Sequence, residues 1–87
     1  MNRIEAIRDR LAALAPLRLD IEDDSAKHAG HKSAGGGGHF RLTIVADAFT
    51  GKSLIQRHRM VYDVLDDLLK QNEIHALSIK AYTAQEI

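Results

Sequence analysis

Apolar residues at the start of the chain recur with the period of a helix. Four of them fall on one side of a helical wheel between positions 4 and 14: Ile4, Ile7, Leu11 and Leu14. Asn2 stands where a helix cap is expected, and Glu5 follows three residues later, as in a capping box. Pro16 cannot continue a helix. We therefore predict a first helix that is capped by Asn2 and ends before Pro16.

Three further segments alternate apolar and polar residues, which is the period of a strand with one buried face. The first is "LRLDIED", about 17–23, whose apolar side includes Leu17. The second begins at His39 and runs through "HFRLTIVA". The third is "IHALSIKAY", in which His75 is in phase with the apolar residues. We expect the first two strands to pair in the antiparallel sense.

The segment between the second and third strands returns to a helical period. "DAFTGKS" reads as a turn or a short helical turn, and a long helix is expected over about 53–71. Its apolar stripe contains Leu54, Val61, Leu65 and Leu68. "TAQEI" can add a last helical turn that begins at Thr83. A strand, a helix and a further strand favour a right-handed parallel crossover, so the third strand should lie parallel to the second.

These elements predict an α+β fold in the order α-β-β-α-α-β, with a three-stranded mixed sheet and both long helices on one face. The 87 residues suffice for one core, so 1–87 should form a single domain. The segment 24–38 has no apolar periodicity and carries the glycines 35–38. Ordering a glycine run is entropically costly, and we therefore predict a mobile Gly/His-rich loop at about 24–38.

Composition excludes several classes of function. Twelve Lys and Arg balance twelve Asp and Glu, so no global field holds the protein on nucleic acid. The chain has no cysteine, which excludes disulfides, thiolate catalysis and the usual ligands of an iron–sulfur cluster. No apolar run approaches a membrane span, and the N-terminus does not resemble a secretory signal. We expect a cytoplasmic protein without a membrane role.

The segment "GKSLIQRHR" concentrates the basic residues Lys52, Arg57, His58 and Arg59. On a helical wheel Arg57 and His58 fall on opposite borders of the apolar stripe, and Arg59 points away from it. The cations can contact phosphates or a partner, or they can form a solvated helix edge. For His58 we favour a packing role.

Two nucleotide- or nucleic-acid-binding motifs resemble this segment without matching it. A P-loop requires a glycine five residues before Gly51, where this chain has Ala46. The G-x-x-G clamp of KH domains requires a second glycine where this chain has Leu54. Neither motif is therefore assigned.

Five histidines are the remaining candidates for chemistry: His28, His31, His39, His58 and His75. Imidazole binds zinc, copper, nickel and iron, but the pair His28 and His31 alone supplies at most two ligands. Zinc binding by these loop histidines is one reading. His39 and His75 each begin a strand, where a histidine can also be half-buried and bonded to a backbone carbonyl.

Read together, "HFRLTIVADAFTGKSLIQRHRMVYDVL" and "IHALSIKAYTAQE" resemble the BolA family over nearly the whole chain. The resemblance implies a fold similar to class II KH domains, in agreement with the order of elements above. It also implies a non-enzymatic protein, a monomer when isolated, that forms a heterodimer with a monothiol glutaredoxin carrying a CGFS motif.

The resemblance further implies that the pair can share a [2Fe-2S] cluster with glutathione, in cluster trafficking or in iron and redox sensing. The family positions map to His28, with His31 as an alternative in the same loop, and to His75. No cluster is expected in the isolated protein. The basic residues Lys52, Arg57, His58 and Arg59 would then serve partner docking. For some bacterial members the resemblance implies instead a DNA-binding regulator of morphology and stress response that uses the KH-like helix-turn-helix region.

Overall fold

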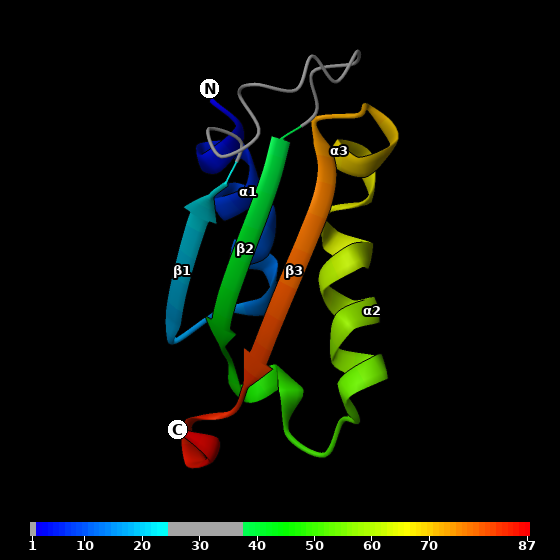
Figure 1. The fold of residues 1–87 in the computed structure, drawn as a ribbon. Coiled ribbons are helices and arrows are strands. Elements are labelled where there is room, and N and C mark those ends of the chain that lie inside the picture. The colour runs from blue at the N-terminus through cyan, green and yellow to red at the C-terminus, as the bar shows by residue number, and fades with distance from the viewer. Residues whose placement is uncertain (1, 25–37) are drawn as a thin grey trace.

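The computed structural model describes residues 2–24 and 38–87 and contains a three-stranded sheet. The strands are β1 (Arg18–Asp23), β2 (Gly38–Val45) and β3 (Ile74–Tyr82), in the order β1-β2-β3 (Figure 1). β1 pairs antiparallel with β2, and β3 pairs parallel with β2. Both predicted pairings are confirmed.

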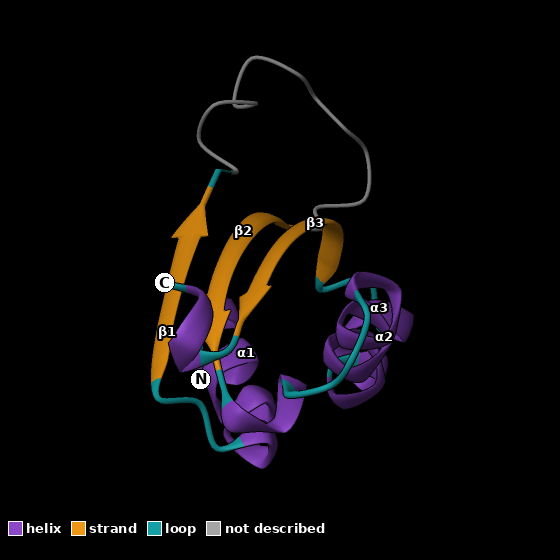
Figure 2. Ribbon diagram, turned by 90° about the horizontal axis from the view of Figure 1, so that it is seen from below, coloured by secondary structure: helices purple, strands orange, loops and turns teal. Residues whose placement is uncertain are grey.

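The helices are α1 (Arg3–Leu11), α2 (Leu54–Val64) and α3 (Asp66–Lys70), and short 3₁₀ turns occupy 12–14, 47–49 and 84–86. Figures 1 and 2 show α1 near β1 and β2, and α2 and α3 near β3. The predicted order α-β-β-α-α-β is confirmed for the described residues, including the last turn after Thr83. Within those residues, none of the helices has the length and apolar character needed to cross a bilayer.

Side-chain caps fix the helix starts as the sequence predicts for α1. Asn2 Oδ1 accepts the backbone N–H of Glu5 at 2.8 Å. At α2, Ser53 Oγ accepts the N–H of Gln56 at 3.2 Å, and Gln56 Oε1 accepts the N–H of Ser53 at 2.8 Å. This reciprocal capping box satisfies two amides that would otherwise lack partners at the helix end.

The predicted helix over 53–71 is two helices with a break at Leu65. The N–H of Leu65 is shared between the carbonyls of Val61 and Tyr62, at 3.2 Å each, and its backbone has φ −99° and ψ 5°. The chain therefore changes direction between α2 and α3, yet Leu65 and Leu68 both stay buried. The apolar stripe continues across the break, which is why the periodicity alone did not reveal it.

The core lies between the helices and one face of the sheet. Its members come from α1, β2, β3, α2, α3 and the turn at 47–49; the largest fully buried side chains are Phe49, Ile7, Leu11, Leu42, Ile44, Leu65, Val45 and Val61. Two apolar residues assigned to buried faces are instead exposed: Leu17 at 62% and Leu54 at 68%. Leu17 precedes β1 and Leu54 is the first residue of α2, so both lie at element ends beyond the reach of the core.

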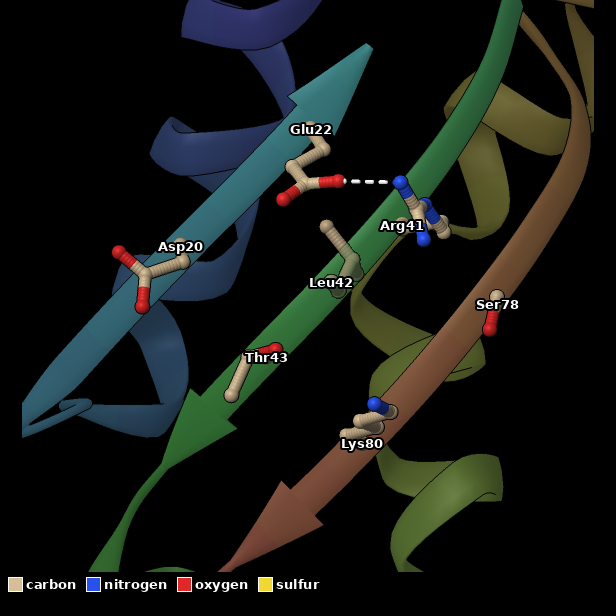
Figure 3. Close-up of a pocket in the computed structure, with 7 residues that line it drawn as sticks. All are labelled: Asp20, Glu22, Arg41, Leu42, Thr43, Ser78 and Lys80. Atoms are coloured by element: carbon tan, nitrogen blue, oxygen red, sulfur yellow. Dashed lines mark ion pairs between the residues drawn. The ribbon is translucent and has the colours of Figure 1, made fainter. Parts of the chain in front are cut away.

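The opposite face of the sheet is polar (Figure 3). Asp20 and Glu22 come from β1, Arg41 and Thr43 from β2, and Ser78 and Lys80 from β3. Arg41 Nη2 lies 2.6 Å from Glu22 Oε2, the ion pair drawn in the figure. The acidic residues of β1 thus share this face with the basic residues of β2 and β3, as is typical of a sheet surface that is solvated on one side.

Candidate functional site

The edge of the sheet where β2 and β3 begin, which we call the rim, holds the two histidines of the described strands, His39 and His75. Because these strands are parallel, their first residues meet at the same edge. Gly38 pairs with Ile74, and the next residue, His39, pairs with Ala76. His75 is therefore an extra residue opposite no partner, which is a β-bulge.

The bulge reverses the orientation predicted for His75. The strict alternation placed His75 in phase with Leu77 and Ile79, but the side chain is exposed, while Ile74 before it is 3% exposed. One additional residue shifts the alternation, so Ile74 takes the inward position and His75 turns to solvent. The predicted phase is wrong, and a half-buried role for His75 is excluded.

His39 lies beside His75 across the two strands. Their ring centres are 5.3 Å apart and the ring planes are tilted by 46°. His39 is half-buried. The pattern of apolar and polar residues does not reveal this proximity, although two parallel strands that each begin near a histidine indicate it.

Gly38 sets the close approach of the chain at this edge. A Cβ there would lie 2.3 Å from Cε2 of Phe40, whose ring is buried, and the Gly38 N–H donates to the carbonyl of Glu73 at 3.1 Å. Glycine is thus required by space at this position, not by an unusual φ. It keeps the start of β2 against the residue that precedes β3.

A hollow of about 290 Å³ adjoins His39 on the polar side of the sheet. Asp24 borders it, and its N–H donates to the carbonyl of His39 at 2.7 Å. Asp24 Oδ2 lies 2.6 Å from Nε of Arg41, which also pairs with Glu22 at 2.6 Å. The one cation beside the hollow is therefore compensated by two carboxylates among the residues that the structure describes.

The loop histidines that are predicted as ligands, His28 and His31, lie outside the described residues. Within 2–24 and 38–87, no cluster of three or more His, Cys, Asp or Glu side chains is arranged to hold a metal ion. Among the described residues, His39 and His75 are the two histidines whose rings lie side by side.

The basic cluster at the other end of the sheet is divided between surface and interior. Lys52 and Arg59 are exposed, and His58 is half-buried, as a packing role predicts. Lys52 follows Gly51, which has φ +76° and open space around it. The capping box of Ser53 and Gln56 engages the amides of these two residues at the start of α2.

Arg57 is not part of a solvated helix edge, and that interpretation is wrong. The residue is 7% exposed. Its Nη1 and Nη2 bond the carboxylate of Glu86 at 2.6 and 3.0 Å. Nε donates to the carbonyl of Lys52 at 2.9 Å, and Nη1 also donates to that of Ala81 at 3.1 Å.

The partner of Arg57 is held in place by the last turn of the chain. Glu86 Oε1 accepts the N–H of Thr83 at 2.7 Å. The hydrogen bonds from Arg57 and from this backbone N–H lower the pKa of Glu86 from 4.5 to about 2, against the opposing effect of burial. The Thr83 and Glu86 spacing is a capping-box signal in the sequence, but nothing there pairs Glu86 with Arg57.

The fold and this site define a class of small α+β domain in which a three-stranded mixed sheet presents a histidine-bearing rim. Residues 11–86 match the family model described as "BolA-like protein". The chain belongs to this family.

Individual relatives agree with that assignment. The chain is 52% identical to the SufE-like protein 1, chloroplastic/mitochondrial, of Arabidopsis thaliana over 93% of its length, and 39% identical over 94% of its length to the DNA-binding transcriptional regulator BolA of Escherichia coli. It spans 24% of the first relative and 76% of the second. It is also similar to the solved BolA domain of SufE1 from Arabidopsis thaliana, with 50% identity, a TM-score of 0.86, and coverage of 100% of this chain and 98% of that one.

Proposed function

We propose that this protein is a non-enzymatic, cytoplasmic partner of a monothiol glutaredoxin and shares a [2Fe-2S] cluster with it. The observation that carries the proposal is the exposed His75 at the rim of the sheet, in a chain of the BolA-like family. The bulge turns this imidazole toward solvent, where a second protein can reach it.

The donor set of this chain fits one half of such a cluster. Imidazoles replace two thiolates in Rieske-type centres, whereas the remaining ligands are cysteines. This chain has histidines and no cysteine, so the thiolates would come from the glutaredoxin and from glutathione. His75 would supply one imidazole, and His28 or His31 the other. The pair would use the shared cluster either in iron–sulfur cluster trafficking or in iron and redox sensing.

The experiment combines the purified protein with a CGFS glutaredoxin, iron, sulfide and glutathione without oxygen. We expect a heterodimer whose visible absorption and circular dichroism differ from those of the glutaredoxin homodimer, because histidine ligation changes the charge-transfer bands. His75→Asn should return the spectrum to that of the homodimer. Lys80→Asn is the control, since Lys80 is an exposed residue of the same strand that the proposal does not use. Identical spectra for wild type and His75→Asn would refute the proposal.

A DNA-binding regulator is the second candidate, and it is supported by the 39% identical Escherichia coli relative that bears this description. Of the basic residues in "GKSLIQRHR", the exposed Lys52 and Arg59 remain available to phosphates. Lys52→Ala and Arg59→Glu should then weaken binding to duplex DNA and reduce its salt dependence. Unchanged binding at low salt in both variants would eliminate this function.

A further inference from the structure

Two histidine rings lie close together at the rim. The ring centres of His39 and His75 are 5.3 Å apart. When two imidazoles each bind a tetrahedral ion through a nitrogen about 2 Å from it, their ring centres come to lie about 5 Å apart. The two rings therefore already have the separation that a shared ion demands.

Both histidines are attached to hydrogen-bonded strands. His39 belongs to β2 and His75 to the bulge of β3, and the two strands pair from Gly38 to Val45. Ligands on a paired sheet lose little conformational entropy when an ion binds, in contrast to ligands on a loop. The exposure of His75 leaves one side of the ion open to water or to a further donor.

The surrounding charges do not oppose a cation. Arg41 borders the hollow beside His39, but it is paired with Glu22 and with Asp24, at 2.6 Å each. Arg3, which bonds the residue that precedes β3, is paired with Glu73 at 2.7 Å. Each of these guanidinium groups is matched by at least one carboxylate, so its field at the rim is largely cancelled.

We propose that His39 and His75 form a two-histidine site for a single divalent ion of the zinc class in the free protein, with water in the remaining positions. Imidazole suits Zn²⁺, Co²⁺, Ni²⁺ and Cu²⁺. Two protein ligands give a weaker and more reversible site than the four of a structural zinc centre. Because His75 cannot bind zinc and an iron of a shared cluster at once, zinc would compete with the partner complex.

The test uses the full chain alone, labelled for NMR and titrated with Zn²⁺ above the ordinary pKa of imidazole. We expect saturation at one ion per chain, with the largest shifts at His39, His75 and their strand neighbours. His39→Asn and His75→Asn should each weaken binding by more than about tenfold, since loss of even an outer-shell partner costs about that much. The amide spectrum of each variant reports whether it is folded, and the exposed His75 is the variant least able to disturb packing.

Two controls separate this site from the other histidines. His58→Asn should leave the affinity unchanged, and so should the double variant His28→Asn with His31→Asn. If folded His39→Asn or His75→Asn binds zinc with unchanged affinity, the proposal is overturned. The same holds when, in addition, the double variant loses zinc binding. The absence of saturable binding in wild type also overturns it. The titration contains no glutaredoxin, so its failure leaves the cluster proposal standing, and failure of the cluster experiment leaves the zinc site standing.

Discussion

The two ends of the parallel pair β2 and β3 differ in the exposure of their polar side chains. Where the strands begin, His75 is exposed and has His39 beside it. Near the end of β3, the guanidinium group of Arg57 is buried and bonded to two backbone carbonyls and to the carboxylate of Glu86. A side chain whose bonds are made within its own chain acts on stability, whereas an exposed donor is available to a ligand.

This difference changes the role that we assign to Arg57 in the basic segment "GKSLIQRHR". Arg57 connects the loop at Lys52 with two segments that are far from it in the chain, strand β3 at Ala81 and the last turn at Glu86. A buried ion pair is destabilising to break because the remaining charge is left without a partner. Arg57 is thus a structural residue, and Lys52 and Arg59 are the cations of the stretch that face solvent.

The largest expected effect follows from Arg57→Met. The variant keeps much of the side-chain volume but removes all bonds to Lys52, Ala81 and Glu86. We expect the midpoint of thermal unfolding, followed by circular dichroism, to fall by several degrees. Zinc binding and cluster spectra measured well below that midpoint should stay unchanged.

His75→Asn is the matched change at the other end of the strands. Because the side chain is exposed, its free energy of unfolding should stay within about 0.5 kcal/mol of wild type, while ligand binding is lost. If Arg57→Met instead abolished binding without lowering the midpoint, the contrast between the two ends would be wrong.

A smaller loss of stability is expected for Gly38→Ala, which tests how tightly the histidine end is built. The added Cβ would lie 2.3 Å from the buried ring of Phe40, and overpacking of this kind typically costs about 1–3 kcal/mol. Urea unfolding measures the cost, and NMR shifts of His39 and His75 report the displaced strand start. Gly51→Ala is the control, since its Cβ would meet no atom within 4 Å and its cost comes only from φ +76°. Equal histidine shifts in both variants would contradict the role given to Gly38.

The smallest effect concerns the pH dependence of the Arg57 end. Glu86 has a folded-state pKa of about 2 against an ordinary 4.5, so its ionised form stabilises the fold above about pH 4.5. That contribution is lost as the pH falls from 4.5 toward 2. The difference in unfolding midpoint between wild type and Glu86→Gln should therefore shrink across this window. Asp67, whose pKa is lowered by its hydrogen bond with Arg10, is present in both proteins and cancels in the comparison. A difference that stays constant with pH would argue against the pair.

Local patterns were sufficient for most of the fold because each element has its own signal. Alternation identified the strands, the Asn2 and Glu5 spacing identified the first cap, and the crossover rule gave the parallel pairing of β2 and β3. The break at Leu65 escaped because the apolar period continues through it. Such a break changes hydrogen bonding without changing the pattern.

The site was less predictable because it depends on contacts between distant residues. A helical wheel places Arg57 on the border of a stripe, but only the folded chain brings Glu86 to it. Alternation likewise gave His75 the wrong side, since a bulge leaves no mark in the order of apolar and polar residues. The proximity of His39 and His75 follows from the parallel register, which the sequence gives only to within a residue or two.

Because of the bulge at His75, the side chain that this edge presents to solvent depends on the number of residues between α3 and Ala76. Deleting one amino acid between the end of α3 and Ala76 would restore plain pairing, and the position before Ala76 would then point into the core. Homologues that differ in length at this connection should accordingly differ in whether they present an imidazole at all, even where the histidine itself is retained.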